Sequence, residues 1–227
     1  MLTERRDADE LMDDPALPPA TYRAVLADLE RVNRTTLAYR PTLTFLRKLL
    51  GERRELRLLD VGFGQGDMLR QIHRMAERHG ITMELVGVDL NPASEPIARA
   101  ATDPRAAITY HTGDYRELPG PFDAIISSLV AHHMTRTQLL EFLRFMESEA
   151  RLGWFVNDLH RHTLAYLGYP LLAGVMGWHP IVRLDGQTSI ARSFRPPEWQ
   201  ALLAEVSITQ ARIERHFPFR LCVSRTR

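Results

Sequence analysis

The sequence predicts an α/β fold, doubly wound, in which a mostly parallel sheet is covered by helices on both faces. Short apolar stretches with strand character alternate with helical patterns along most of the chain, as is typical of parallel sheets. The 227 residues are 44% apolar, which suffices for one well-buried core but hardly for two full domains. A glycine-rich loop directly follows the first apolar stretch, as at the first turn of a doubly wound sheet.

The N-terminal part is expected to lie outside this sheet. Residues 1–15 are rich in acids and arginine and have few apolar anchors, so we expect a mobile arm or a loosely attached helix without a chemical role. From Pro19 to Leu50, apolar residues recur at helical spacing, which predicts two or three helices with a break at Pro41. We therefore divide the chain into an arm with lid helices, residues 1–50, and a main domain, residues 51–227.

The main domain is expected to alternate between strands and helices. The expected strands cover residues 56–61, 82–88, 107–111, 122–127 and 152–157. The expected helices cover residues 66–79, 93–101, 135–150, 163–177 and 196–206. The insertion at residues 160–190 combines the fourth of these helices with a loop that bears glycine and proline, and the tail 207–224 is expected to form two strands joined around Pro218.

The composition narrows the possible partners. Lysine and arginine number 29 against 28 acids, so no global field attracts nucleic acid or an anionic membrane. Cys222 is the single cysteine and cannot form an internal disulfide, and the charged N-terminus has no apolar signal core, so we expect a cytoplasmic protein. The segment from Leu164 to Trp178 is apolar but too short to cross a membrane, and Pro170 interrupts it.

The loop after the first strand indicates which ligand the chain binds. Glycine lets the backbone approach a cofactor because it has no Cβ, and Gly62, Gly64 and Gly66 supply three such positions. A dinucleotide site has the spacing Gly-x-Gly-x-x-Gly and holds a pyrophosphate at a helix N-terminus. Here the spacing differs, and Asp60 and Asp67 flank the loop. Two acids repel a pyrophosphate but suit an ammonium and a sulfonium, so the pattern favours S-adenosylmethionine over NAD or FAD.

A further acid, at the end of the second strand, extends this pattern. Asp89 ends the second strand, where a carboxylate with two acceptor oxygens suits the vicinal diol of a ribose. With these motifs the chain resembles the class I S-adenosylmethionine-dependent methyltransferases, whose sheet is Rossmann-like and seven-stranded. The resemblance covers roughly residues 35–227 and rests on Asp60-Val61-Gly62-Phe63-Gly64-Gln65-Gly66, Gly87-Val88-Asp89-Leu90-Asn91, Thr112-Gly113-Asp114-Tyr115 and Phe122-Asp123-Ala124-Ile125-Ile126-Ser127-Ser128. Phe63 departs mildly from the family, in which small or polar residues are common at this position.

The resemblance implies a strand order of 3-2-1-4-5-7-6 with strand seven antiparallel. Residues 51–227 would then be a methyltransferase domain, and the insertion at residues 160–190 a substrate lid. The cofactor would be S-adenosylmethionine, with the acid of the third motif near the adenine amino group. The implied cofactor-binding residues are Asp60, Gly62, Gly64, Gly66, Asp67, Asp89, Leu90, Asp114, Tyr115, Ser128 and Leu129.

Two histidines follow the fourth strand, at the carboxyl edge where open α/β sheets bind ligands. Methyl transfer to an oxygen requires that the nucleophile be positioned and its proton removed, and a histidine that titrates near neutrality is a suitable base. We therefore expect either His132 or His133 to be the catalytic base. Asp158 ends the fifth strand at the same edge, where it would orient a histidine or bind the acceptor hydroxyl.

The acceptor pocket is expected to use residues that follow the fifth strand. His160 and Arg161 would line it, the lid would roof it with side chains such as Tyr166, and Arg192 would hold an enolate or a carboxylate. The apolar lid is equally compatible with a dimer surface, so a monomer and a homodimer both remain open. Histidines and acids are metal-ligand types, but the adjacent histidine pair has no recognised zinc spacing, and we expect no metal.

A closer resemblance bears on the acceptor. The turn Asn157-Asp158-Leu159-His160-Arg161 and the segment Ser189–Arg195 are similar to small methyltransferases encoded beside bacterial type III polyketide synthases. This resemblance implies a phenolic, quinone or pyrone acceptor from secondary metabolism. We accordingly expect O-methylation of a phenolic or enolic hydroxyl on a small hydrophobic metabolite. Methylation at carbon, a non-methylating use of the bound nucleoside and an NAD-dependent reductase remain the alternatives.

Overall fold

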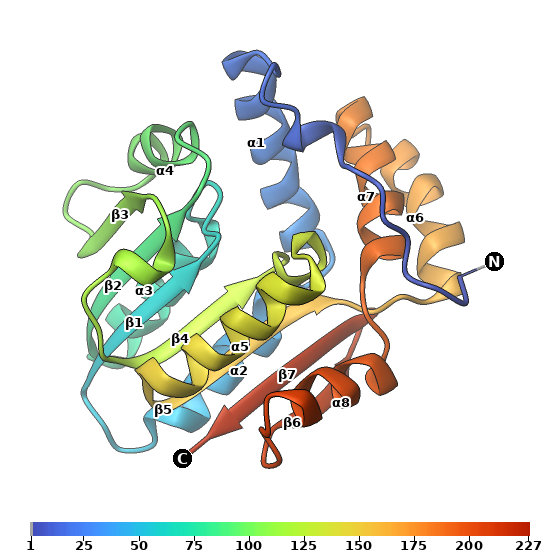
Figure 1. Ribbon diagram of the computed structural model, residues 1–227. Coiled ribbons are helices and arrows are strands. Elements are labelled where there is room, and N and C mark those ends of the chain that lie inside the picture. Colours follow the sequence, from blue (N-terminus) through green and yellow to red (C-terminus); the bar gives the residue numbers. More distant parts are fainter. Residues whose placement is uncertain (1) are drawn as a thin grey trace.

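The computed structural model describes residues 2–227 and contains one seven-stranded sheet (Figure 1). The strand order is β3-β2-β1-β4-β5-β7-β6, and β7 runs antiparallel to β5 and β6, which confirms the order expected from the sequence. The strands are β1 (Glu55–Val61), β2 (Thr82–Asp89), β3 (Ile108–Thr112), β4 (Phe122–Ser128), β5 (Ala150–Leu159), β6 (Arg212–His216) and β7 (Arg220–Thr226). The expected strand positions are therefore confirmed, and β1, β2 and β4 end together at the edge that carries the glycine loop.

Helices cover both faces of the sheet because each presents an apolar stripe to it. On one face, α2 (Tyr39–Leu50) and α3 (Asp67–His79) share a buried cluster with β1 and β2. On the other face, α5 (Arg136–Glu149) and α8 (Pro196–Glu205) pack around Trp154 and Trp199, both fully buried. The short helix α4 (Ser94–Ala101) follows β2. This is the doubly wound arrangement, in which ligands bind at the carboxyl edge of the strands.

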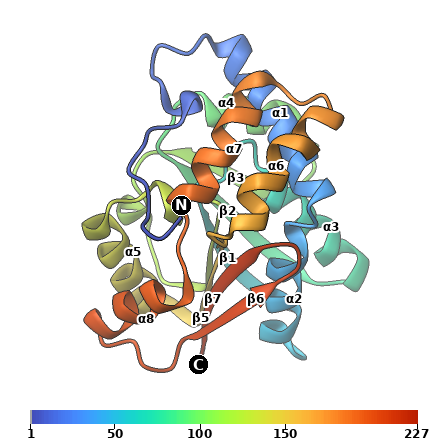
Figure 2. The same ribbon diagram turned by 90° about the vertical axis from the view of Figure 1, so that its right-hand side faces the viewer.

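Three helices gather above that edge. They are α1 (Pro19–Thr35), α6 (Thr163–Val175) and α7 (Pro180–Arg192), and Figures 1 and 2 show them standing on the same side of the sheet. Val25 and Val32 of α1 share a small buried cluster with Ala173, Trp178 and Val182. The helices thus form a cap over the sheet edge. Among residues 2–227, no helix is both long enough and apolar enough to cross a membrane.

Two local predictions were wrong. The segment after α6 was expected to be a loop, but it forms α7, which begins with Pro180 at its first turn and is capped by the His179 side chain. Gly186 is required inside α7 because the ring of Tyr169 lies directly against it. A Cβ at this position would come within 2.0 Å of that ring. The N-terminal helices do not break at Pro41, which lies in the first turn of α2, where a missing N–H costs nothing.

The N-terminal arm is packed onto the protein, contrary to the expectation of a mobile segment. Leu2 and Glu10 are each only 4% exposed. The guanidinium of Arg5 donates to the carbonyl oxygens of Arg192 (2.5 Å) and His132 (2.6 Å) and lies over the ring of Phe194. These anchors are polar contacts with distant parts of the chain, so apolar periodicity could not reveal them.

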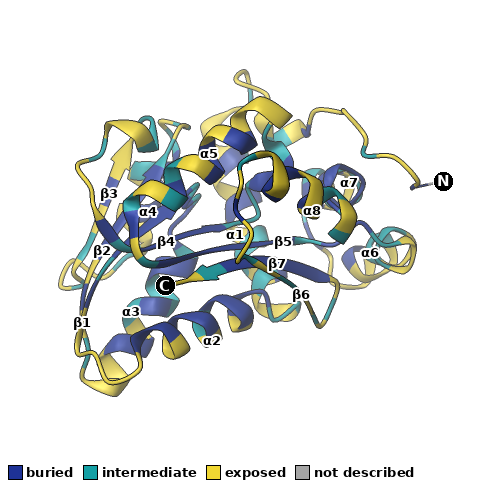
Figure 3. Cartoon of the chain, turned by 60° about the horizontal axis from the view of Figure 1, so that its bottom comes forward, coloured by how far each residue is buried: buried dark blue, intermediate teal, exposed yellow. Residues whose placement is uncertain are grey.

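Helix α6 keeps many of its apolar side chains exposed. Figure 3 shows buried residues along the sheet and the inner helix faces, whereas α6 is mostly exposed or intermediate. The exposed apolar side chains on and just after this helix are Leu164, Leu167, Leu171, Leu172, Val175 and Met176. The helix therefore packs on α7 with one side and leaves a second apolar side open to solvent.

Candidate active site

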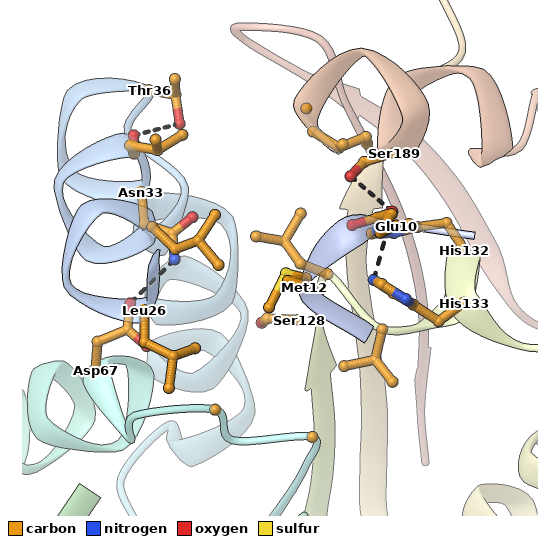
Figure 4. A pocket seen from close by; sticks show the side chains of 18 of the residues that line it. Glu10, Met12, Leu26, Asn33, Thr36, Asp67, Ser128, His132, His133 and Ser189 are labelled. Atoms are coloured by element: carbon orange, nitrogen blue, oxygen red, sulfur yellow. Dashed lines mark hydrogen bonds and ion pairs between the residues drawn. The ribbon is translucent and has the colours of Figure 1, made fainter. Parts of the chain in front are cut away.

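A large cavity of about 750 Å³ lies between the sheet edge and the helical cap. Its floor comes from the loop after β1 and the ends of β2, β4 and β5, and its walls come from α1, α6, α7 and the arm. Figure 4 shows Leu26, Asn33 and Thr36 of α1 on one side and Glu10, His132, His133 and Ser189 on the other, with Met12 and Ser128 between them. The cavity therefore brings the predicted cofactor loop and the predicted histidines into one space.

The glycine loop has a backbone that other residues adopt only with strain. Gly62 and Gly66 have φ angles of 79° and 74°, in the left-handed region. A Cβ on Gly62 would come within 2.3 Å of the Val130 side chain, and one on Gly66 would meet the Tyr110 hydroxyl at the same distance. Glycine is therefore required at both positions, because Val130 and Tyr110 pack directly against the loop on the side where a Cβ would lie.

Asp89 is held by the loop it faces. One of its carboxylate oxygens accepts from the Gly64 N–H (2.8 Å) and the other from the Asn91 N–H (2.9 Å). Each oxygen keeps a free acceptor position, so the fixed carboxylate can accept two hydroxyl groups of a ribose. The next residue, Leu90, is 74% exposed and also lines the cavity. Its side chain offers an apolar surface against which a flat nucleobase can pack.

Asp60 and Asp67 lie behind the loop in a small adjoining cavity. Asp60 is 1% exposed, and one of its carboxylate oxygens has no hydrogen-bond partner within residues 2–227. Burial, with the nearby carboxylates of Asp67 and Asp89, raises the pKa of Asp60 well above its usual value. Asp67 accepts from the Tyr39 hydroxyl (2.7 Å) and from Asn33 (3.0 Å). A buried acid without a partner fits a ligand that carries an ammonium group.

The remaining residues implied for cofactor binding divide into two groups. Tyr115, Ser128 and Leu129 line the large cavity, and the Ser128 hydroxyl has no hydrogen-bond partner within residues 2–227. Leu129 has a φ of 62°, an uncommon backbone for leucine that marks a constrained position at the end of β4. Asp114 does not line the cavity, because its carboxylate forms an ion pair with Arg116.

His132 lines the side of the cavity that faces α1 and forms a buried pair with Asp158, which does not itself line the cavity. The Nδ1 atom of His132 lies 2.7 Å from one Asp158 oxygen, and the other oxygen accepts from the His132 backbone N–H at 2.9 Å. Burial alone would lower the pKa of His132, but the carboxylates of Asp158 and Glu10 outweigh it and raise the pKa to about 9. At neutral pH, His132 is therefore a charged group that organises its neighbours.

Glu10 joins the two histidines, although its segment was expected to have no chemical role. Its Oε1 atom lies 3.5 Å from Nε2 of His132 and 3.7 Å from Nε2 of His133, and it accepts from the Ser189 hydroxyl at 2.8 Å. Asp13, from the same arm, lies 3.0 Å from Nδ1 of His133. Burial opposes ionisation of Glu10, but hydrogen bonding and attraction to His132 lower its pKa.

The same atoms have the arrangement of a possible metal site. One ligand atom each from Glu10, His132 and His133 lie within 4.8 Å of one another. Each histidine also has a carboxylate at Nδ1, as metal-bound histidines commonly do. The cluster can therefore hold either a proton or a cation, an alternative that histidine spacing alone could not indicate because the third ligand comes from the arm.

The predicted acceptor residues lie in different places. His160 lines the cavity, and burial together with the nearby cation of Arg215 lowers its pKa to about 4, so it is neutral. Arg161 lies outside the cavity, with an ion pair to Glu198 at 2.7 Å. Tyr166 also lies outside the lining and contacts the arm. Arg192 supports the histidine cluster from behind, since it donates to the carbonyl oxygen of His133 at 3.3 Å.

Residues 58–149 match a protein family described as "Methyltransferase domain". The protein is an S-adenosylmethionine-dependent methyltransferase. Its cofactor is S-adenosylmethionine, which supplies an electrophilic methyl group, and the loop, Asp60 and Asp89 are suited to hold it. A search of curated proteins by sequence finds no match.

Solved structures share the fold at low sequence identity. The plantazolicin methyltransferase BpumL, in complex with a monoazolic desmethylPZN analog and SAH, has a TM-score of 0.64 and 15% identity over 86% of this chain and 73% of that chain. A SAM-dependent methyltransferase from Aquifex aeolicus has a TM-score of 0.62 and 15% identity over 92% and 97% of the two chains. Magnesium protoporphyrin IX methyltransferase from Synechocystis PCC 6803 has a TM-score of 0.55 and 17% identity over 84% of each.

Three residues with strong site geometry were not predicted. Glu10 and Asp13 belong to a polar arm that carries no motif, and Arg220 is one arginine among many near the C-terminus. Only the folded chain brings the first two to the histidines and the third to the cavity. No spacing in the sequence signals these contacts, because each joins segments that are far apart along the chain.

Proposed function

We propose that the protein transfers the methyl group of S-adenosylmethionine to a phenolic or enolic oxygen on a small hydrophobic acceptor, with His133 as the general base. The observation that carries this proposal is the position of His133 in the cavity wall, between two carboxylates of the arm. A pure binding protein has no need of such a cluster beside its nucleoside site. The cluster therefore favours chemistry over storage of the cofactor.

The two histidines have different proposed roles. His132 is 2% exposed and has a pKa of about 9, so its proton stays in place at neutral pH. His133 is partly exposed to the cavity, and Asp13 at its Nδ1 favours the tautomer with a lone pair on Nε2. The Nε2 atom can then take the acceptor proton. Asp13 and Glu10 stabilise the resulting imidazolium, as an orienting acid does in other histidine-based sites.

The proposed reaction balances without a further reactant. The acceptor oxygen loses its proton to His133 and forms a bond to the methyl carbon. The carbon–sulfur bond breaks with its electron pair on sulfur, which gives S-adenosylhomocysteine. His133 then releases its proton to solvent. The enzyme's contribution is position, proton removal and exclusion of water.

The cavity wall supports an apolar acceptor. Between the cofactor loop and the histidines, the lining is dominated by apolar side chains from the arm, α1 and α6, namely Met12, Leu26, Leu29, Leu164, Ala165, Tyr169 and Leu172. Such a lining favours an aromatic or alkyl-bearing molecule, with a few polar groups fixing its orientation. A phenol, hydroquinone or hydroxypyrone of the polyketide type meets both requirements, in line with the resemblance of residues 157–161 and 189–195.

A panel of acceptors tests the proposal. The enzyme and S-adenosylmethionine would be incubated with alkyl phenols, hydroquinones and hydroxypyrones, and the products analysed by mass spectrometry for a gain of one CH₂. Proton NMR of the product then separates a methoxy group from a methyl group on carbon. We expect methoxy products from apolar acceptors and none from the same acceptors with the hydroxyl already blocked. A product methylated on carbon would show that the nucleophile is carbon and not oxygen. If none of the hydroxylated acceptors is methylated, the proposal is contradicted.

A further inference from the structure

Arg220 is a buried cation at the cofactor end of the cavity. It is the first residue of β7 and lies opposite Leu159 in the pairing with β5, so its position is fixed by the sheet. Its side chain reaches both the large cavity and the small cavity behind the glycine loop, although the residue is only 2% exposed. Burial lowers the pKa of the guanidinium, but arginine keeps its charge in proteins.

The guanidinium lacks the partners that such a group requires. Its one hydrogen bond is a long one, from Nη2 to the Thr36 hydroxyl at 3.3 Å. The Nε and Nη1 atoms are buried without a hydrogen-bond partner, and no carboxylate within residues 2–227 forms an ion pair with Arg220. The carboxylate whose charge acts on Arg220, that of Asp158, is already paired with His132. A buried and unpaired cation is costly to the fold, so the site is built for an anion that arrives with a ligand.

An unpaired acid lines the same small cavity. Asp60 contributes a buried carboxylate oxygen without a partner, and the other polar residues of the lining include Asn33, Tyr39 and Asp67. One end of the cavity therefore offers both an unsatisfied cation and an unsatisfied acid. The complementary ligand group carries an anion and a cation a few bonds apart, as the α-carboxylate and α-ammonium of an amino acid do.

We propose that Arg220 binds the α-carboxylate at the amino acid end of S-adenosylmethionine, while the ammonium of that end faces Asp60. Arg220 would then be a determinant of cofactor specificity that lies outside the glycine loop and its βαβ unit. A carboxylate on the acceptor is the other possible source of the anion. The cofactor is favoured because Arg220 and the acids of the glycine loop share the small cavity, whose lining includes none of Glu10, His132 and His133.

Two ligands that differ only in the carboxylate test this assignment. S-adenosylhomocysteine and its decarboxylated analogue, which keeps the ammonium, would be titrated by calorimetry into the wild-type protein and into Arg220→Gln. We expect Arg220→Gln to weaken S-adenosylhomocysteine by at least about 10-fold and the decarboxylated analogue by less than about twofold, because a charged hydrogen bond is lost only in the first case. Arg220→Lys should recover part of the loss.

A thermal melt separates ligand binding from a structural role. Without ligand, Arg220→Gln should melt at or above the wild-type temperature, because it removes an unpaired buried charge. Arg161→Gln is the matched control, since Arg161 is equally buried but paired with Glu198. That control should melt at a lower temperature and bind S-adenosylhomocysteine as the wild type does.

Two results would overturn the assignment. Equal weakening of both ligands would mean that Arg220 supports the fold of the site. Unchanged affinity for S-adenosylhomocysteine would exclude the cofactor carboxylate, and a raised KM for a carboxylated acceptor in that case would assign the anion to the acceptor. These binding measurements do not depend on methyl transfer, so they can fail or succeed independently of the proposed function.

Discussion

The two ends of the cavity are built in different ways. The cofactor end is made largely by residues 60–90, one continuous βαβ unit in which Asp89 is hydrogen bonded to the glycine loop. The acceptor end is assembled from four separate segments, which contribute Glu10 and Asp13, His132 and His133, Asp158, and Ser189 and Arg192. The comparison teaches that the glycine loop and Asp89 are a local unit of the chain, which distant residues such as Ser128 and Arg220 complete, whereas the acceptor end has no such local unit.

The ends also differ in how well their polar groups are satisfied. At the acceptor end, His132 pairs with Glu10 and Asp158 and His133 pairs with Glu10, although Nη1 of Arg192 is buried there without a hydrogen bond. At the cofactor end, atoms of Asp60, Ser128 and Arg220 are buried without partners. Buried polar groups are normally paired, so the unpaired set indicates where a ligand completes the structure. Cofactor binding should consequently stabilise the fold, while the acceptor end is already preorganised.

The largest effect is expected from replacing the proposed base, which should reduce turnover without weakening cofactor binding. In His133→Ala, we expect kcat to fall by about 10²- to 10⁴-fold, the range for loss of a general base. The affinity for S-adenosylhomocysteine should stay within about threefold, because His133 lies outside the glycine loop. Steady-state kinetics and calorimetry measure the two quantities. His162→Ala is a suitable control, since His162 caps α6 and does not line the cavity. A parallel loss of cofactor affinity would contradict the separation.

Replacing Asp89 should have the opposite effect, weaker cofactor binding with little change in turnover. In Asp89→Ala, the affinity for S-adenosylhomocysteine should fall by about 10- to 100-fold, because two hydrogen bonds to the ribose and the support of Gly64 are lost together. At saturating S-adenosylmethionine, kcat should change by only a few fold. A normal dissociation constant in calorimetry would show that Asp89 does not hold the cofactor.

A change of pH should loosen the acceptor end alone. The pKa of His132 is about 9 in the folded protein against an ordinary value of 6.5, so its contribution to stability is complete below pH 6.5 and is lost as the pH rises through 9. The pKa values of Glu10, Asp13 and Asp158 are lowered, so their contributions are lost on acidification instead. The arm should therefore exchange amide hydrogens faster at pH 10 than at pH 7, relative to the intrinsic rates. His132→Gln should abolish this difference, and an equal change in the β1 loop would argue against a local effect.

The smallest expected effect comes from removal of metal ions. If the cluster of Glu10, His132 and His133 carries protons, as proposed, dialysis against a chelator should leave kcat unchanged. Activity that is lost on dialysis and restored by Zn²⁺ would assign a cation to the cluster, whose ligand atoms lie close enough to hold one. Elemental analysis of the purified protein provides a second measure that does not depend on the acceptor.

The same comparison explains how much the sequence could reveal. The glycine loop and Asp89 are local patterns, and the family resemblance that rests on them implies the strand order that the structure contains. Helix α7 was missed because Pro180 and Gly186 suggest a loop, yet proline suits a first turn and the glycine is needed for contact with Tyr169. The role of the arm was missed because its anchors are polar pairs, which leave no periodic signal.

The predicted acceptor residues show the same limit. The edge of the sheet was correctly expected to gather His132, His133 and Asp158 in one region. Arg161 was expected in the pocket, but its guanidinium points to Glu198 and to carbonyl oxygens of the arm. A position at the end of a strand therefore indicates nearness to the site, whereas the direction of a side chain depends on packing that only the tertiary structure specifies.

The central claim is that the arm completes an acceptor end that is separate from the cofactor end. The most direct measurement is the double substitution Glu10→Gln with Asp13→Asn, which removes both carboxylates and preserves shape. We predict that kcat/KM for the acceptor falls by about 10²-fold or more, because His133 loses the groups that orient it and stabilise its charge. The dissociation constant for S-adenosylhomocysteine should stay within about threefold of the wild type. Unchanged turnover, or a loss of cofactor affinity equal to the loss of activity, would contradict the account.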